Sequence, residues 1–462
     1  MFAINNGKIV IHFVGIGGIG MSGIAEITHS LGYIVQGSDK TNSQNTDRLT
    51  RLGIKVIIGH DASNVDNANV VVYSSAIKQN NPELIQAKKL RIPCLTRAEM
   101  LSQIVRFKKS VVVAGSHGKT TVTSLCASVL EMASFHPTVV NGGIIHSYNS
   151  NAKLGTGDWA VIESDESDGS FTQFFPTVGI ITNIDKEHMT HYGNFENLKN
   201  AFKTFLYNTP FFGAGVVCVD DPNICDIVKD MTDRKIITYS IYQDSMFKAT
   251  NIRKSANGSV FDVLHFDEII TDVSIPLLGD HNIRNSLSVI AMANELGIDI
   301  NTVKSTLSSY TGVNRRFTIV GKIYNTLVVD DYAHHPTEIK SLLNSARQKV
   351  SGKIILIHQP HRFTRLNTLF NEFCNCFDMA DTIIITPVYK ADDIETAPIT
   401  ADNLYEELKK KNDNVFFAND MQEIKQLLLN MTFAKDDIIL FSGAGSISKW
   451  AHDIVRQIGQ HI

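Results

Sequence analysis

The sequence predicts an α/β protein with three domains. Short runs rich in β-branched residues alternate with amphipathic helical stretches along the whole chain, which is typical of parallel βαβ units. Two glycine-rich loops each lie between such a run and a helical stretch. The chain has 462 residues, of which 43% are hydrophobic and 19% charged. That length suits about three domains of ~150 residues each.

The first domain is predicted over residues 1–107. Its strand candidates are "KIVIHFVG", "IVQGSD", "VIIGHD" and "VVVYSS", and its helix candidates include "MSGIAEITHSLG" and "QNTDRLTRLG". Strands and helices in strict alternation predict a Rossmann-like fold.

The first glycine-rich loop lies in this domain. Gly15, Gly17 and Gly20 follow a strand and open a helix, and Asp39 ends the next strand. Glycines in this pattern let a pyrophosphate approach the backbone at a helix N-terminus, and the acid can bind a ribose hydroxyl. The geometry suits any nucleoside diphosphate, a UDP-sugar as well as NAD, and a plain tight turn is the structural alternative.

The second domain is predicted over residues 108–312, and it opens with the second loop. "GSHGKTT" lies between a "VVV" strand and an apolar helix, although Val113 stands where the usual P-loop has a glycine. Backbone amides and the Lys119 ammonium can still face the β- and γ-phosphates, and the Thr120 hydroxyl can bind Mg²⁺. The loop therefore predicts ATP binding.

Two acidic clusters follow strands of the same domain. Each alone is typical of a solvated loop, but together beside a P-loop they favour a Mg²⁺ site, because Mg²⁺ needs one or two carboxylates near the phosphates. The clusters are Glu163, Asp165, Glu166 and Asp168, and Asp185, Glu187, His188 and His191. Either Glu163 or Glu166 can be the metal ligand.

The third domain is predicted over residues 313–462. Arginine and histidine residues follow its strand candidates. Pro336 comes directly after a histidine pair and suits the first turn of a helix. We expect one face that recognises phosphate and carboxylate. Its residues are Arg315, Arg316, Asp330, Asp331, His334, His335, His361, Arg362 and Arg365.

Charge, cysteine content and apolar segments indicate what the protein binds and where it is found. A net charge of −4 argues against nucleic-acid binding. The six cysteines are scattered, which predicts free thiols in a reducing compartment. The apolar N-terminal run lacks a basic flank and is broken by glycines, and no segment resembles a membrane span, so we expect a cytoplasmic protein that does not contact membrane.

The ordered motifs resemble the Mur ligases of bacterial cell-wall synthesis. They are "GIGGIGMSGIAE", "GSHGKTT", "ESDESD", "NIDKEHM", "HNIRN", "RRF", "DDYAHHPTE" and "QPHRFTR". The resemblance covers the whole chain, and "GIGGIGMSG" with "HRFTR" favours the alanine-adding branch. It implies a Rossmann-like UDP-binding domain, a central P-loop ATPase-type domain and a C-terminal Rossmann-like domain.

The resemblance also implies the chemistry. ATP, UDP-N-acetylmuramate and L-alanine would be the substrates, with two Mg²⁺ ions, and the enzyme would be a monomer or homodimer. The lactyl carboxylate would attack the γ-phosphorus of ATP, and the amine of alanine would displace phosphate from the resulting acyl phosphate. One glycine-rich loop would then hold UDP and the other ATP.

Residue roles follow from the matching motifs. The catalytic group would comprise Lys119, His188, His334, Arg362 and Arg365, and the metal ligands Thr120, Glu163 and His188. ATP would contact Gly115, Ser116, His117, Gly118, Lys119, Thr120, Thr121, His281, Asn282, Asn285, Arg315 and Asp330. The UDP-sugar would contact Gly15, Gly17, Gly18, Ile19, Gly20, Ser38, Asp39, Ser75 and Ala76.

Several alternatives remain at this point. A recycling ligase that joins a ready-made peptide to UDP-N-acetylmuramate would share nearly every motif. An NAD-dependent oxidoreductase would use the first loop alone, and an ATP-driven switch would hydrolyse ATP without making a bond. Related ligases carry a carbamylated lysine on the helix after the "EHM" segment. Lys203 lies on that stretch, but its register with the family position is not fixed, and a surface lysine is the simpler interpretation.

Overall fold

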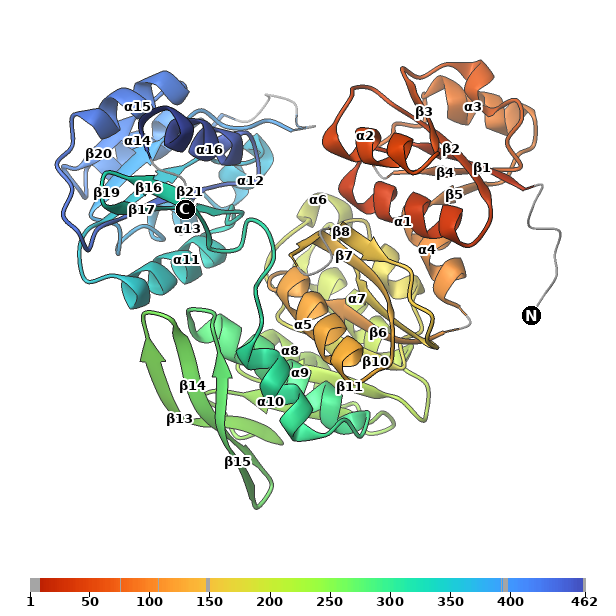
Figure 1. The fold of residues 1–462 in the computed structure, drawn as a ribbon, viewed down its shortest axis with the longest axis horizontal. Helices are drawn as coiled ribbons and strands as arrows, with labels where there is room; N and C mark the ends of the chain where they lie inside the picture. Colours follow the sequence, from red (N-terminus) through yellow and green to blue (C-terminus); the bar gives the residue numbers. More distant parts are fainter. Residues whose placement is uncertain are drawn as a thin grey trace. The chain divides into compact units, whose positions relative to one another are not determined.

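A computed structural model describes residues 9–74, 76–106, 108–146, 150–391, 393 and 398–459 (Figure 1). It is an α/β protein with three sheets, as the sequence predicts. The chain divides into two compact units. The N-terminal unit contains residues 1–251, 261–273 and 284–312, and the C-terminal unit contains residues 252–260, 274–283 and 313–462.

The first sheet has the order β3-β2-β1-β4-β5, and its pairings are parallel. Its strands are β1 (Val10–Val14), β2 (Ile34–Asp39), β3 (Lys55–Ile58), β4 (Val70–Tyr73) and β5 (Cys94–Thr96). Its helices are α1 (Ile19–Ser30), α2 (Gln44–Arg51), α3 (Pro82–Lys89), α4 (Arg97–Val105) and the 3₁₀ turn η2 (Ala62–Val65).

Local sequence explains where these helices begin. The Ser43 side chain caps α2 in a capping box with Thr46, and Thr96 caps α4 in the same way with Glu99. Asn81 caps α3, whose first residue is Pro82. The predicted βαβ alternation is therefore built from helices that start at good caps.

A buried carboxylate ties this domain together. Glu83 in α3 is fully buried and accepts hydrogen bonds from Ser38 Oγ at 2.7 Å and Asn64 Nδ2 at 2.6 Å. His60 Nδ1 lies 3.0 Å from the carboxylate and His12 Nε2 lies 3.6 Å from it. Burial alone would raise the pKa of Glu83, but the contacts with His12, Asn64 and Ser38 outweigh burial and lower it.

We expect Glu83→Ala to lower the free energy of unfolding by about 3 kcal/mol. The change leaves the buried hydrogen-bond donors and the two histidine rings around Glu83 without their carboxylate partner. A carboxyl whose folded pKa is lowered stabilises the fold above its unfolded pKa, and that stability is lost as pH falls through the folded value. Urea unfolding should therefore show wild type losing more stability than Glu83→Gln below about pH 4. The exposed control Glu196→Ala should change stability by under about 0.5 kcal/mol.

The second sheet has the order β15-β14-β13-β12-β11-β10-β6-β9-β7-β8. Its strands are β6 (Lys109–Ala114), β7 (Thr138–Ile145), β8 (Ser150–Lys153), β9 (Trp159–Glu163), β10 (Val178–Ile181), β11 (Ala214–Cys218), β12 (Ile236–Ser240), β13 (Phe247–Ser255), β14 (Gly258–His265) and β15 (Glu268–Ile275). Its helices are α5 (Lys119–Met132), α6 (Met189–Tyr192), α7 (Phe195–Tyr207), α8 (Pro222–Val228), α9 (Asp280–Glu295), α10 (Ile300–Ser308) and η3 (Ser170–Gln173).

The centre of this sheet is parallel and almost completely buried. β6 pairs with β9 and β10, and Val111, Val112 and Val113 are all fully buried. A continuous run of β-branched residues is what a strand covered on both faces requires. Such a strand delivers whatever follows it to the carboxyl edge of the sheet, where α/β proteins bind ligands.

The third sheet has the order β16-β17-β21-β18-β19-β20, parallel except that β16 runs antiparallel to β17. Its strands are β16 (Thr318–Ile323), β17 (Thr326–Asp331), β18 (Ile354–His358), β19 (Thr382–Ile385), β20 (Val415–Phe417) and β21 (Ile438–Ser442). Its helices are α11 (Pro336–Lys349), α12 (Phe363–Thr368), α13 (Phe370–Cys374), α14 (Ala401–Lys409), α15 (Met421–Leu429) and α16 (Ile447–Ile458).

Two predictions from composition can be compared with the structure. All six cysteines are free thiols, as expected from their spacing. Within the described ranges, no helix has both the length and the apolar character that crossing a membrane requires.

Candidate active site

The second glycine-rich loop joins β6 to α5 in a left-handed conformation that glycine favours. Gly115 has φ +133° and Gly118 has φ +83°. A Cβ atom on Gly115 would lie 2.1 Å from Thr182 Oγ1, so a side chain at this position would displace the neighbouring strand end. Glycine is therefore required at Gly115 and favoured at Gly118, both of which belong to the predicted phosphate-binding motif.

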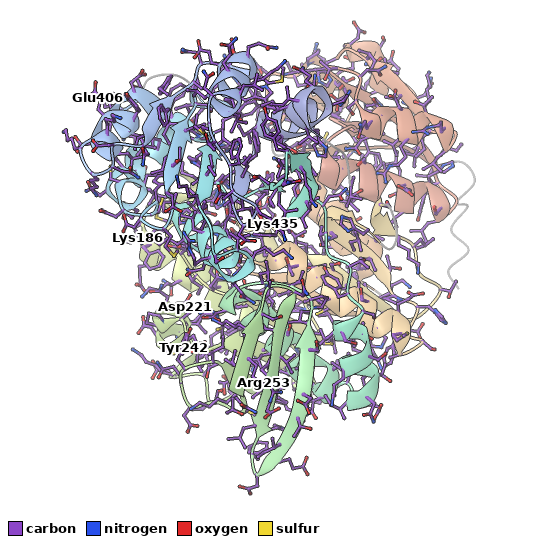
Figure 2. All side chains as sticks on the ribbon, turned by 60° about the vertical axis from the view of Figure 1, so that its left-hand side comes forward. Lys186, Asp221, Tyr242, Arg253, Glu406 and Lys435 are labelled. Atoms are coloured by element: carbon purple, nitrogen blue, oxygen red, sulfur yellow. The ribbon has the colours of Figure 1, made fainter. Side chains whose placement is uncertain are left out.

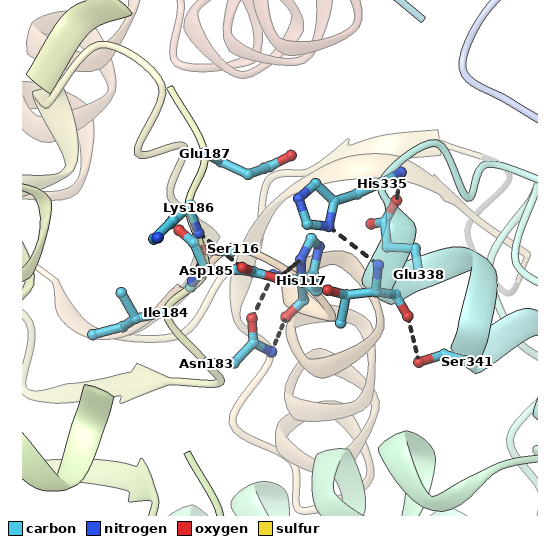
Figure 3. A network of polar contacts seen from close by, with 12 residues as sticks. Ser116, His117, Asn183, Ile184, Asp185, Lys186, Glu187, His335, Glu338 and Ser341 are labelled. Atoms are coloured by element: carbon cyan, nitrogen blue, oxygen red, sulfur yellow. Dashed lines mark hydrogen bonds and ion pairs between the residues drawn. The ribbon is translucent and has the colours of Figure 1, made fainter. Parts of the chain in front are cut away.

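The segment after β10 holds this loop in place (Figure 3). Asn183 accepts the Ser116 N–H through its carbonyl at 3.0 Å and the His117 N–H through Oδ1 at 2.9 Å. Thr182 Oγ1 donates to the His117 carbonyl at 2.6 Å, and His117 Nε2 lies 3.2 Å from Asp185 Oδ2. These contacts leave the loop little freedom to change shape when a ligand binds.

Asp221, labelled in Figure 2, holds the same segment through its carboxylate. Its carboxylate accepts the Ile184 N–H at 2.7 Å and caps α8 through the Asn223 N–H at 2.8 Å. Burial raises the pKa of Asp221, and these backbone hydrogen bonds oppose the rise. The loop after β10, which carries Asp185 and His188, is thereby tied to the segment between β11 and α8.

Lys119 is the cation of the loop. Its Nζ donates to the Gly115 carbonyl at 2.5 Å and to Glu166 Oε2 at 2.7 Å. Burial would lower the pKa of Lys119, but the carboxylates of Glu166, Asp165 and Glu163 raise it overall. The ammonium therefore stays charged at neutral pH.

The acidic residues form two groups beside Lys119. Thr120 Oγ1 donates to Glu163 Oε1 at 3.0 Å, and the Gly142 N–H donates to Glu163 Oε2 at 2.6 Å. Ligand atoms of Asp165, Glu166 and His188 lie within 4.8 Å of one another. Each group contains oxygen donors of the kind that Mg²⁺ prefers.

Glu166 is the acid whose position is hardest to explain by folding alone. It is 1% exposed, and its Oε1 atom has no hydrogen-bond partner among the described residues, although His188 Nε2 lies 3.6 Å away. Burial would lower the pKa of His188, but Glu166 and Glu187 raise it overall. An unsatisfied carboxylate oxygen beside a P-loop lysine is consistent with a cation ligand.

The first glycine-rich loop joins β1 to α1 and is hydrogen-bonded to the C-terminal end of β2. The Ser38 carbonyl accepts the N–H groups of Gly15 at 2.8 Å and Ile16 at 3.0 Å, and Asp39 Oδ2 accepts the Gly17 N–H at 2.8 Å. A Cβ on Gly17 would lie 2.9 Å from Asp39 Oδ2, whereas a Cβ on Gly18 would meet nothing closer than 3.4 Å. Gly17 is therefore needed by the fold, and Gly18 is not.

The other predicted sugar-nucleotide residues have different environments. Ser38 is fully buried and its hydroxyl is bonded to Glu83, so it holds the loop through its backbone carbonyl. Ile19 and Gly20 are the first two residues of α1, and Ala76 follows β4. Ser75 lies outside the described residues.

In the C-terminal unit, the predicted cations gather where β17, β18 and β21 end. Arg315 Nη2 donates to the Gly443 carbonyl at 2.7 Å, and its Nε lies 3.8 Å from Asp330 Oδ2. The guanidinium lies over the Tyr332 ring at 4.7 Å. Burial raises the pKa of Asp330, and Ser448 and Arg315 oppose the rise.

His361 is the centre of a second cluster on this face. Its ring stacks on Tyr389 at 5.6 Å and lies 5.5 Å from the His334 ring, and its Nδ1 is 3.2 Å from Arg365 Nη1. Burial, with the electrostatic effects of His334, Arg365 and Arg362, lowers the pKa of His361 to about 3. The ring is therefore neutral at physiological pH and can accept a hydrogen bond from Arg365.

Three further predicted residues lie early in α9, and Lys203 lies in α7. His281 and Asn282 belong to the C-terminal unit, where Asn282 Nδ2 donates to the Leu278 carbonyl at 2.7 Å. Asn285 belongs to the N-terminal unit, and its Oδ1 would lie 3.0 Å from a Cβ on Gly118. Asn285 thus covers the second loop. The Lys203 side chain is half-buried.

The structure therefore brings the predicted residues together in two groups. Lys119, Thr120, Glu163 and His188 meet in the N-terminal unit, and Arg315, Asp330, His334, Arg362 and Arg365 gather at strand ends of the C-terminal unit. Sequence reasoning missed Thr182, Asn183 and Tyr389. The only available signal was that the first two directly follow a buried strand.

Comparison with known proteins identifies relatives over the whole length. Three family models match consecutive ranges: the Mur ligase family catalytic domain at 10–109, the Mur ligase middle domain at 113–293, and the Mur ligase glutamate ligase domain at 315–445. The chain is 43% identical to the UDP-N-acetylmuramate–L-alanine ligase of Brucella anthropi, covering 98% of this chain and 97% of that protein. It is 45% identical to the same-named ligase of Methylorubrum extorquens, covering 97% of each.

Solved structures agree with the sequence relatives. The crystal structure of the UDP-N-acetylmuramate–alanine ligase of Thermotoga maritima matches with a TM-score of 0.83 and 30% identity, covering 97% of this chain and 99% of that one. A murein peptide ligase of Psychrobacter arcticus matches with a TM-score of 0.73 at 21% identity, covering 98% and 99%. The latter likeness is one of fold.

Proposed function

The chain belongs to the Mur ligase family, and from that membership we infer that it joins L-alanine to UDP-N-acetylmuramate in a reaction driven by ATP. The observation that carries the inference is full-length similarity to ligases of that name, at 43–45% identity. The two glycine-rich loops then hold different nucleotides, which explains why the chain contains two such loops.

We assign ATP to the second loop. The charged Lys119 ammonium and the N–H groups of the first turn of α5 would face the β- and γ-phosphates, and Asn285 covers the loop from α9. Thr120 with Glu163, and Glu166 with His188 and Asp165, would hold Mg²⁺, and both groups have the oxygen-rich donor set that the ion requires. When bound there, Mg²⁺ would neutralise charge on the transferring phosphoryl group.

We assign the sugar nucleotide to the first loop. The loop leads into the N-terminus of α1, whose first-turn N–H groups favour a pyrophosphate. Asp39 holds the Gly17 N–H through one carboxylate oxygen, and its Oδ1 is 3.4 Å from the Thr41 N–H. The carboxylate can therefore fix the loop and still accept a ribose hydroxyl.

We assign amino-acid recognition to the C-terminal face. Arg365 is oriented by the neutral His361 ring and presents a planar guanidinium suited to the alanine carboxylate. His334, which lies against the same ring, and Arg362 complete the group, and Arg315 with Asp330 would contact the nucleotide.

The reaction then proceeds in two steps, formation of an acyl phosphate and its displacement by the amine of alanine. A lactyl carboxylate oxygen attacks the γ-phosphorus, the bond to the β-phosphate oxygen breaks, and ADP leaves. The alanine amine attacks the acyl carbon, loses a proton, and inorganic phosphate leaves with the former carboxylate oxygen. Lys119 and the arginine face lower the barrier by stabilising negative charge as it develops.

An isotope experiment tests this chemistry. UDP-N-acetylmuramate labelled with ¹⁸O in the lactyl carboxylate should transfer one label to inorganic phosphate for each amide bond formed. Mass spectrometry of the phosphate measures the transferred label, and mass spectrometry of the nucleotide product measures the amide bonds formed. Unlabelled phosphate would exclude the acyl phosphate. Incorporation of an intact tripeptide that begins with L-alanine, but not of free alanine, would indicate a recycling ligase.

We further propose the domain limits 1–107, 108–312 and 313–462, a cytoplasmic location and a monomeric or homodimeric enzyme. The last segment of the C-terminal unit begins at Val313, which supports the third limit. UDP-N-acetylmuramate is a soluble nucleotide, which suits the proposed location.

Gly18→Val tests the assignment of the first loop. A Cβ at this position meets no protein atom closer than 3.4 Å, so the fold should tolerate the change. The branched side chain should block approach of the pyrophosphate and raise the KM for the sugar nucleotide by at least about 10-fold, with the KM for ATP unchanged. Steady-state kinetics with each substrate varied measures both constants. A larger effect on ATP would mean that the two loops are assigned the wrong way round.

A further inference from the structure

Arg97 lies between the two glycine-rich loops, although no motif marks it. It is the first residue of α4, and the Thr96–Glu99 capping box fixes the start of that helix. α4 packs against α1, which follows the first loop, and against η3, which follows the acidic segment of the second domain. Ser102 Oγ also donates to the Gln173 carbonyl at 3.4 Å. The helix therefore spans the junction between the two sites within one unit.

The Arg97 side chain crosses the first turn of α1. A Cβ on Gly20 would lie 3.0 Å from Arg97 Nη1 and 3.2 Å from its Cδ. Gly20, the last glycine of the first loop, therefore makes room for this arginine. The guanidinium reaches the helix end that favours anions.

The same guanidinium faces the acids of the second site. Arg97 Nη2 lies 3.9 Å from Asp165 Oδ2. Ligand atoms of Asp165 and Glu166 lie within 4.8 Å of each other, and Glu166 is bonded to Lys119 at 2.7 Å. A short series of contacts thus leads from the first loop to the P-loop lysine.

Protein stability does not account for this placement. The Asp165 side chain is 48% exposed, and an exposed ion pair at 3.9 Å contributes little. A cation in the first turn of a helix is opposed by the helix dipole. The Arg97 side chain is itself 20% exposed, so part of it remains accessible to a ligand.

We propose that Arg97 binds an anionic group of the sugar nucleotide and directs the substrate carboxylate toward the phosphate end of the ATP site. The inference rests on the proposed ligation. Two groups of that substrate share the required chemistry, the diphosphate and the lactyl carboxylate. A guanidinium can grip either through two parallel hydrogen bonds.

Equilibrium binding of UDP, UDP-N-acetylglucosamine and UDP-N-acetylmuramate to the full-length protein tests the proposal. Arg97→Ala should weaken UDP-N-acetylmuramate by about 10- to 100-fold, as loss of a charged hydrogen bond predicts, and change the Kd of ATP by less than about 2-fold. Arg97→Lys should give an intermediate loss. Arg106→Ala, at the exposed end of the same helix, is the matched control and should bind like wild type.

The three ligands separate the two sources of charge. An equal loss for UDP and both sugar nucleotides identifies the diphosphate, and a loss confined to UDP-N-acetylmuramate identifies the lactyl carboxylate. Unchanged binding of UDP-N-acetylmuramate would overturn the proposal. Equal losses for ATP and the sugar nucleotide, together with a lower unfolding midpoint, would also overturn it, because Arg97 would then be a structural bridge. A wild-type protein that binds no UDP-sugar would instead refute the proposed function.

Discussion

Replacement of Lys119 by alanine is expected to reduce the turnover number for ligation by at least about 10²–10³-fold, the usual effect of removing one charged group from a transition state. Lys119 is the cation of the second glycine-rich loop, which we assign to ATP, and three carboxylates keep it protonated. Glutamine would not restore activity, because it lacks the charge.

The measurement is kcat by phosphate release, with circular dichroism to confirm folding. Lys229→Ala removes a lysine of the same unit that is 61% exposed, and it should leave kcat unchanged. Removing Lys119 also leaves Glu166 buried without its cation, so some loss of stability is expected. A folded Lys119→Ala variant with wild-type turnover would remove the second loop from the chemistry.

Arg365→Lys is expected to weaken use of alanine sharply. Lysine keeps the charge but cannot form two parallel hydrogen bonds to a carboxylate, nor the contact with His361 Nδ1 at 3.2 Å. Loss of one charged hydrogen bond of about 1.5–3 kcal/mol raises the KM for alanine about 10- to 100-fold. Because His361 stays neutral from about pH 5 to 9, the effect should not depend on pH over that range.

Equilibrium Kd values for ATP and UDP-N-acetylmuramate should barely change in the same variant. Arg456→Lys, at a position 68% exposed in the same unit, is the matched control. Equal losses for all three substrates would show that Arg365 is structural. No loss would mean that another cation holds the amino acid.

Sequence patterns predicted those parts of the structure that depend on neighbouring residues. In each loop the buried strand, the glycines and the helix that follows are adjacent in the sequence, so a short stretch of residues is enough to predict the turn. Gly15, Gly115 and Gly118 have the positive φ that such a turn requires. The histidine pair before Pro336 is equally local, since His335 is the N-cap of α11. Capping and turn chemistry are readable without knowledge of the tertiary fold.

Features built by tertiary contact could not be predicted. Glu83 gathers His12, Ser38, His60 and Asn64 from separate elements, and no spacing in the sequence indicates that network. The sequence likewise does not reveal that the Ser38 hydroxyl is hydrogen-bonded to Glu83 within the domain. The strand β13, "FKATNIRKS", is polar and half exposed, so it lacks the apolar run that marked the central strands.

The choice between Glu163 and Glu166 shows the same limit. Glu163 is the last residue of β9 and Glu166 lies three residues later, so the sequence alone does not favour one over the other as a metal ligand. Only the folded chain separates them, since Glu163 contacts Thr120 and the Gly142 N–H whereas Glu166 contacts Lys119 and faces His188. Each could then serve a different Mg²⁺ ion.

Phosphate release with UDP-N-acetylmuramate, ATP and Mg²⁺ tests the central claim most directly. Each reaction receives L-alanine, another amino acid, the intact tripeptide or nothing. The account predicts release that depends on alanine and matches, one for one, the formation of UDP-N-acetylmuramoyl-L-alanine. Release that is indifferent to alanine, or that requires the tripeptide, would contradict it.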